Sequence, residues 1–205
     1  MPSYAYVHGL NSGSSSRSGN ELEKVIGAPV YRVQMDYSKN FWECLQSLEE
    51  QLRKNIAPQD GQLTLMGTSL GAFYATQLRM PQIGQVIAWN PVIFPALQLA
   101  RFVGENTRFT DGVKWQFGRA ACLSYAAAPD PRQWDNAYLA DSLSKQPQEW
   151  AEGAPCPRRD IILGIHDEIL DYELSDVYWR DHASILHIDS GHHIEHFDNV
   201  LTLIE

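Results

Sequence analysis

The chain has 205 residues, and its 16 lysines and arginines stand against 25 aspartates and glutamates, which gives a formal net charge of −9. This length suits one domain with a single sizeable core, and 44% apolar with 11% aromatic residues excludes a disordered or fibrous chain. Because contacts to phosphate need clustered positive charge, which this sequence lacks, we expect no nucleic-acid partner.

Two further features bear on the cellular setting. No apolar run approaches the roughly 20 residues that cross a bilayer, and the N-terminal residues lack the basic and apolar segments of a secretory signal, so we expect no membrane association. Cys44, Cys122 and Cys156 are scattered and odd in number. We therefore expect reduced thiols in a cytoplasmic protein, with neither a disulfide framework nor a metal site.

The N-terminal part of the chain alternates short strands and helices. Residues 4–7 are expected to form a strand that ends at His8-Gly9, and a Ser- and Gly-rich loop over residues 11–20 leads to a helix near Glu21. Residues 29–34 alternate apolar and polar side chains, which predicts a second strand.

The clearest helix follows this second strand. Ser38 or Asn40 can cap its start, and Pro58 can stop it. Its apolar side chains recur at steps of four and three and form one stripe, made of Phe41, Leu45, Leu48, Leu52 and Ile56.

The rest of the chain continues the alternation. The third strand is expected over residues 62–66, after which Gly67 breaks it. Further strands are expected over residues 85–89, 160–164 and 184–188, with helices over 70–78 and 172–179 and a closing segment over 194–204. Short apolar strands separated by helices predict an α/β fold with a mostly parallel sheet of about six strands and helices on both faces.

One long stretch interrupts this rhythm. Residues 95–157 contain no convincing strand but many aromatic residues, and so long an interruption inside a compact domain is usually functional or poorly ordered. Because the aromatic density argues against disorder, we expect a single domain over residues 1–205, with residues 95–158 as a cap or lid inserted after the fourth strand. The alternative is a peripheral subdomain that only enlarges the core.

The sharpest chemical signal is the segment Gly67-Thr68-Ser69-Leu70-Gly71, a G-x-S-x-G between an expected strand and an expected helix. A serine at such a turn sits in strained backbone with its hydroxyl exposed, and the flanking glycines let strand and helix approach each other. Ser69 is therefore a candidate nucleophile. The alternative is an ordinary tight turn with a surface serine.

A serine nucleophile needs a histidine base and a carboxylate that orients the histidine, in the chain order Ser, acid, His. Asp167 follows the fifth expected strand and is the candidate acid, with Asp171 as the less favoured alternative. His192 and His193 follow the sixth strand, after Gly191, and either can be the base.

The oxyanion of such a reaction needs two backbone donors. One is the amide of Leu70, directly after the candidate nucleophile. The other is expected from the loop after the first strand, where Leu10 is the candidate. We expect His8, in the same loop, to be structural and not a base.

Together these segments resemble the YqiA-like (UPF0227) family of small bacterial esterases, which have the α/β-hydrolase fold. The resemblance rests on His8-Gly9-Leu10-Asn11-Ser12, Gly67-Thr68-Ser69-Leu70-Gly71-Ala72-Phe73-Tyr74-Ala75, Asn90-Pro91, His166-Asp167-Glu168-Ile169-Leu170-Asp171-Tyr172 and Gly191-His192-His193. It implies a serine hydrolase that cleaves esters or thioesters of small acyl groups and needs no cofactor. The sequence departs from the family pattern at Leu10 and Ala72, and residues 115–157 are longer than the resemblance leads us to expect.

The identity of the base stays open. His193 fits the Gly-Gly-x-His spacing of the family, whereas His192 directly follows the turn glycine and places Phe197-Asp198 in register with a family Phe-acid pair. We favour His192 and keep His193 as the alternative.

Other functions fit the sequence less well. His192-His193-Ile194-Glu195-His196 matches the H-x-x-E-H metalloprotease motif, but that motif needs a helix, whereas Gly191 predicts a turn. The Ser-rich loop over residues 12–19 lacks the Gly-Lys-Ser/Thr end of a phosphate-binding loop. Acyl transfer by the same groups, or a binding protein that keeps the fold without catalysis, remain alternatives to a hydrolase.

Overall fold

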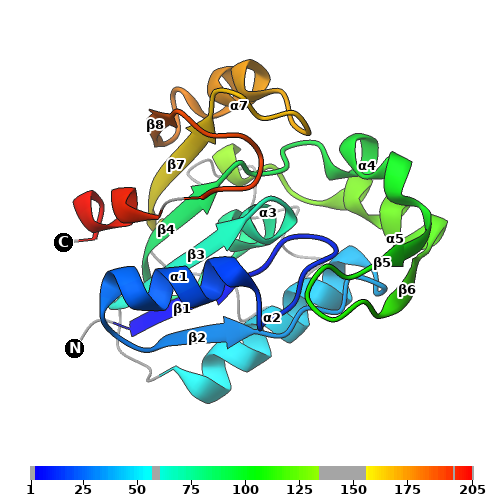
Figure 1. Cartoon of the computed structure of the whole chain (residues 1–205), viewed down its shortest axis with the longest axis horizontal. Coiled ribbons are helices and arrows are strands. Elements are labelled where there is room, and N and C mark those ends of the chain that lie inside the picture. The colour runs from blue at the N-terminus through cyan, green and yellow to red at the C-terminus, as the bar shows by residue number, and fades with distance from the viewer. Residues whose placement is uncertain (1–2, 57–60, 134–155, 196, 205) are drawn as a thin grey trace.

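The computed structural model describes residues 3–56, 61–133, 156–195 and 197–204. In this part of the chain a six-stranded sheet has the order β2-β1-β3-β4-β7-β8, and every neighbouring pair is parallel (Figure 1). Its strands are β1 (Ser3–Val7), β2 (Val30–Val33), β3 (Leu63–Thr68), β4 (Ile83–Trp89), β7 (Arg158–Gly164) and β8 (Ser184–Ile188). The chain therefore adds β2 on one side of β1 and β3 on the other, so the crevice at the carboxyl ends of β1 and β3 is where such sheets bind ligands.

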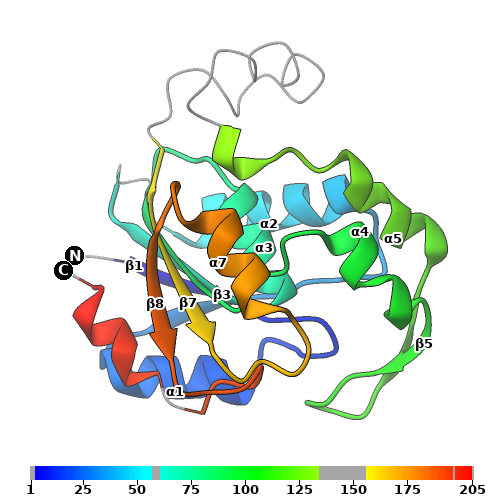
Figure 2. The same cartoon turned by 90° about the horizontal axis from the view of Figure 1, so that it is seen from above.

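Helices cover both faces of this sheet, as the sequence predicts (Figure 2). One face carries α1 (Arg17–Ile26) and the 3₁₀ helix η5 (Asp198–Thr202), whose Leu22 and Val200 belong to the smaller apolar core. The other face carries α2 (Phe41–Asn55), α3 (Leu70–Gln77) and α7 (Tyr172–Trp179), which share the larger core. Both faces of the sheet are thus covered, which explains why its central strands β3, β4 and β7 are almost wholly buried.

Helix α2 confirms the predicted stripe and decides between the two possible caps. The Asn40 side chain accepts from the Glu43 N–H, and the Glu43 carboxylate accepts from the Asn40 N–H (both 3.0 Å), which is a complete capping box. The stripe residues within the helix are all buried: Phe41, Leu45, Leu48 and Leu52. Ser38 instead bonds to Asp36.

Strand β3 differs from the prediction at its end. Gly67 does not break the strand, because β3 runs on to Thr68 and Gly67 pairs with Val7 and Ala88 in the two neighbouring strands. A glycine without a side chain suits this position, where the backbone of α3 comes close to the strand.

Residues 95–157 do contain strands, which corrects the expectation that they have none. β5 (Gly104–Thr107) and β6 (Lys114–Phe117) form an antiparallel hairpin apart from the main sheet. Apolar periodicity gives no sign of it because most of its side chains are exposed or half-buried. The remaining elements here are short: α4 (Pro95–Gln98), η1 (Ala100–Phe102), α5 (Arg119–Ser124), η2 (Tyr125–Ala127) and η3 (Pro131–Gln133).

The expected lid extends beyond the part of the chain that the structure describes, because residues 134–155 lie outside it. The lid therefore stays a prediction. The described part of this segment consists of the β5–β6 hairpin and the short helices before Trp134. Within the described ranges, no helix is long and apolar enough to span a bilayer.

Candidate active site

Ser69 stands at the turn between β3 and α3 in strained backbone. Its φ of 54° and ψ of −119° lie in a region that serine rarely adopts, and its N–H donates to the Trp89 carbonyl (2.9 Å). Its hydroxyl makes no hydrogen bond to any residue that the structure describes. The turn thus presents an unpaired hydroxyl at the carboxyl end of the sheet, which is the geometry a G-x-S-x-G nucleophile needs.

The two motif glycines are required because strand β3 and helix α3 nearly touch. A Cβ on Gly67 would lie 2.6 Å from the Gly71 backbone, and a Cβ on Gly71 would lie 2.5 Å from the His8 carbonyl oxygen. Real Cβ atoms almost never come within 3.0 Å of another heavy atom. Any other residue at these positions would therefore push α3 away from β1 and β3.

We expect Gly71→Ala to lower the free energy of unfolding by about 3 kcal/mol or more, because neither strand nor helix can move without losing buried contacts. Urea unfolding followed by circular dichroism measures this. Gly118→Ala is the matched control, since a Cβ on Gly118 meets nothing within 4 Å and its φ of −72° suits alanine. Equal stabilities of the two variants would contradict the packing argument.

Asp167 and His192 meet at the carboxyl end of the neighbouring strands. His192 Nδ1 lies 2.8 Å from Asp167 Oδ2, and the two side chains are only 9% and 1% exposed. The other oxygen, Oδ1, accepts from the N–H groups of Ile169 (2.8 Å) and Leu170 (2.7 Å). The carboxylate is thus satisfied on both oxygens, and it holds the proton of the imidazole on Nδ1, which leaves Nε2 as the basic nitrogen.

A second carboxylate holds the backbone of the same histidine. Glu168 Oε2 accepts from the His192 N–H (3.0 Å), and this hydrogen bond is the main reason that the pKa of Glu168 is lowered. Two consecutive acidic residues therefore fix the ring and the backbone of His192. No local sequence pattern marks this role of Glu168.

Asn90 ties this loop to the strand beside Ser69. It follows β4 in a left-handed conformation (φ 43°), its Oδ1 accepts from the Gly164 N–H (2.8 Å), and its Nδ2 donates to the carbonyls of Gly191 (3.2 Å) and His192 (3.3 Å). The next residues also hold the serine, because the Val92 N–H donates to the Ser69 carbonyl (3.3 Å). The end of β4 thus brings Ser69 and the His192 loop to the same edge of the sheet.

The loop after β1 reaches this edge as well. A Cβ on Gly9 would lie 3.2 Å from Ser69 Cβ, so the loop lies directly against the serine. The Gly9 carbonyl accepts from the Ser12 N–H (3.3 Å) and pairs with His8 Nδ1 (2.9 Å). Because the C=O and N–H of a trans peptide point in opposite directions, the Leu10 N–H points away from both partners.

The two predicted oxyanion donors belong to segments next to Ser69, because Leu70 follows it in the chain and Leu10 follows Gly9, which lies against it. Leu70 is the first residue of α3, so its N–H has no partner within the helix. Among the described residues, the Leu10 N–H donates to no carbonyl either. Both amides thus lack a hydrogen-bond partner among the described residues, and their role as oxyanion donors stays a prediction.

His8 begins this loop, and its contacts are structural. Its Nε2 accepts from the Met35 N–H (3.3 Å), and its ring meets Tyr37 edge-on. Burial lowers the pKa of His8, and both ring nitrogens have partners that suit the neutral form. It takes no part in the pair formed by Asp167 and His192.

Asn11 joins the same loop to the β5–β6 hairpin. Its φ of 59° is left-handed, its Nδ2 donates to Asn106 (3.2 Å), and its Oδ1 accepts from the Trp115 Nε1–H (2.9 Å). Its carbonyl accepts from the Phe109 N–H (2.7 Å), at the tip of the hairpin. The hairpin therefore supports the loop that carries the Leu10 amide, a connection that the sequence gives no means to predict.

His193, the alternative base, has different neighbours. Its ring meets the rings of Phe109 (centroids 6.4 Å apart) and His192 (5.8 Å), and among the described residues it has no hydrogen bond to Asp167. Residues 192–195 form no helix, which the H-x-x-E-H motif would require, and His196 lies outside the described residues. Asp171, the alternative acid, caps α7 by accepting from the Leu174 N–H (3.0 Å).

Comparison with known proteins places the chain in a family. The sequence model of the uncharacterised protein family UPF0227 matches residues 3–205. The chain belongs to UPF0227. No curated protein matches this UPF0227 chain.

Solved structures share its fold at low sequence identity. Est1E from Butyrivibrio proteoclasticus aligns with a TM-score of 0.63 at 16% identity, over 99% of this chain and 84% of that chain. FphF, a fluorophosphonate-binding serine hydrolase of Staphylococcus aureus, gives 0.60 at 15% identity, over 99% and 82%. A monoacylglycerol lipase from Paleococcus ferrophilus gives 0.60 at 15%, over 98% and 93%. The UPF0227 chain therefore has the α/β-hydrolase fold, as predicted.

Proposed function

We propose that this UPF0227 protein is a serine hydrolase that cleaves carboxylic esters or thioesters of small acyl groups through an acyl-enzyme. The observation that carries the proposal is the buried hydrogen bond between Asp167 and His192, held at the same sheet edge as the unpaired hydroxyl of Ser69. The fold that the chain shares with an esterase domain, a lipase and a fluorophosphonate-binding hydrolase supports it.

The mechanism follows from the positions of these groups. His192 Nε2 takes the proton of the Ser69 hydroxyl, whose oxygen attacks the acyl carbonyl. The amides of Leu10 and Leu70 bind the oxyanion, and Asp167 stabilises the imidazolium. The imidazolium then gives its proton to the leaving alcohol or thiol. A water molecule, deprotonated by the same histidine, releases the acid and restores the serine.

A fluorophosphonate probe tests the proposal without knowledge of the substrate. Ser69 attacks phosphorus, fluoride leaves, and the protein gains the mass of the phosphonyl group. We expect stoichiometric labelling of the intact protein, located at Ser69 by peptide mass spectrometry and absent after heat denaturation. A folded protein that stays unlabelled would contradict the proposal and favour a binding protein with the same fold.

Acyl transfer is the second candidate because it uses the same catalytic groups. Product analysis with an added alcohol or amine separates the two: a hydrolase gives the free acid as its main product. A transferase gives the new ester or amide.

A further inference from the structure

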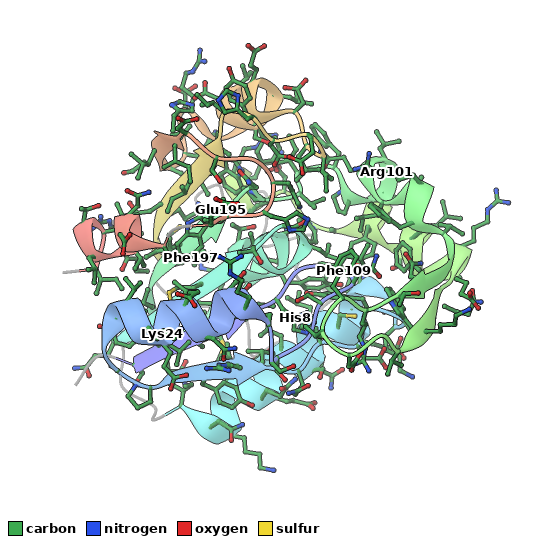
Figure 3. The ribbon with its side chains drawn as sticks, viewed as in Figure 1. His8, Lys24, Arg101, Phe109, Glu195 and Phe197 are labelled. Carbon is green, nitrogen blue, oxygen red and sulfur yellow. The ribbon has the colours of Figure 1, made fainter. Side chains whose placement is uncertain are left out.

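Phe109 is a large apolar side chain that the fold holds at the surface beside the candidate active site. It lies in the turn of the β5–β6 hairpin (Figure 3), and it is 75% exposed. Its backbone is tied to Asn11 by a 2.7 Å hydrogen bond, and its ring meets the His193 imidazole edge-on, with planes at 84°. So exposed a ring gains little free energy from burial, so its contribution to folding is small.

The two anchors of Phe109 belong to the two loops that flank Ser69. Asn11 follows the proposed oxyanion donor Leu10, and His193 follows the proposed base His192. Phe109 therefore bridges the loop after β1 and the loop after β8. Its ring therefore lies beside the two loops that would hold a substrate at Ser69.

The chemistry of the reaction decides which part of the substrate the ring meets. The base must give its proton to the leaving group, so the leaving group lies on the side of His192. His193 stands next to His192 on that side, and Phe109 next to His193, with ring centroids 5.8 Å and 6.4 Å apart along this series. The pair of Phe109 and His193 thus faces the alcohol part of an ester and not its acyl part.

The charge around His193 narrows the class of leaving group further. A cavity of about 640 Å³ beside His193 is lined by the carboxylates of Glu168, Asp189 and Glu195. Asp189 pairs with His166 (3.0 Å) and Glu168 interacts electrostatically with His192, whereas Glu195 forms no ion pair among the described residues. Their field disfavours an anionic leaving group, such as a thiol that carries phosphates.

We infer that Phe109 is a specificity-determining residue that selects an uncharged aromatic alcohol as the leaving group. Aromatic rings prefer edge-to-face contacts of the kind Phe109 already makes with His193. The inference rests on the proposed function, since it needs Ser69 and His192 to act as nucleophile and base.

Acetate esters that differ only in the leaving group provide the test. We expect Phe109→Ala to lower kcat/KM on 2-naphthyl acetate by about five- to tenfold and on ethyl acetate by less than about twofold. Comparing variant with wild type on each substrate removes the difference in chemical reactivity between the two esters. Phe109→Leu should lose less, because it keeps an apolar side chain.

Two controls and one further measurement complete the experiment. Val177→Ala removes an apolar side chain that is 64% exposed on α7, and it should leave both rates unchanged. Both esters give the same acetyl-enzyme, and the leaving group has departed before this intermediate is hydrolysed. Because Phe109 is inferred to contact only the leaving group, the rate of this hydrolysis should be the same in wild type and in Phe109→Ala. Wild type should cleave the 6-sulfonate of 2-naphthyl acetate about tenfold less well than the parent ester, and added salt should narrow the gap.

Equal losses on both acetates, no loss on either, or a preference for the sulfonated ester would overturn the inference. These outcomes are distinct from a failure of the proposed function. In that case fluorophosphonate would not label Ser69 and neither acetate would be cleaved by the wild type.

Discussion

Turnover of a short-chain 4-nitrophenyl ester should fall by on the order of 10⁶-fold in Ser69→Ala, because the variant lacks the hydroxyl proposed to form the acyl-enzyme. Single-turnover release of 4-nitrophenol measures the loss. Ser47→Ala, which changes an exposed serine of α2, is the control and should keep full activity. Wild-type turnover in Ser69→Ala would refute the proposed mechanism.

The free energies of unfolding of Ser69→Gly and Ser69→Ala test whether the backbone at residue 69 is strained. Its backbone at φ 54° and ψ −119° costs an alanine about as much as a serine, whereas glycine adopts it freely. We expect Ser69→Gly to exceed Ser69→Ala in free energy of unfolding by about 1 kcal/mol, measured by urea titration. If the glycine variant were no more stable, the elbow would store no strain.

Much of the fold can be predicted from the sequence because buried parallel strands and amphipathic helices carry strong local patterns. The expected helix over residues 172–179 and the expected strand over residues 184–188 have the same bounds as α7 and β8. Helix α2 follows from its apolar stripe, which buries one face against the sheet. In these elements the local pattern and the tertiary packing agree.

The β5–β6 hairpin could not be predicted from apolar periodicity, since it is held by backbone pairing and by contacts to another loop. Its β5 sequence, Gly-Glu-Asn-Thr, has no apolar residue at all. The signal that could have found it is Asp111-Gly112, a typical hairpin-turn pair, with Gly112 at φ 71°.

The residues proposed for catalysis follow from motif order, whereas those that hold them in place do not. Ser69 comes directly after β3, Asp167 and His192 lie in the loops that follow β7 and β8, and the parallel sheet brings those strand ends to one edge. Asn90 and Glu168 act through hydrogen bonds to backbone groups of the His192 loop, which is distant in the sequence. Such bonds depend on the path of the chain in space, so no local pattern marks them.

Asp167→Asn is expected to lower kcat on the same nitrophenyl ester by about 10⁴-fold with little change in structure. The N–H groups of Ile169 and Leu170 require an oxygen opposite them, so the asparagine must turn its NH₂ toward His192 Nδ1. An NH₂ there demands an unprotonated Nδ1, which moves the imidazole proton to Nε2. His192 can then no longer accept the proton of Ser69.

Asp171, the alternative acid, provides the control for this experiment. Asp171→Asn should keep wild-type kcat and stability, because asparagine caps a helix as well as aspartate does and, among the described residues, the Asp171 side chain bonds only to the Leu174 N–H. Matching circular dichroism spectra and urea midpoints would show that Asp167→Asn loses activity through the tautomer and not through unfolding. The reverse pattern, with Asp171→Asn inactive and Asp167→Asn active, would transfer the role of the acid to Asp171 and leave the buried pair of Asp167 and His192 a structural contact.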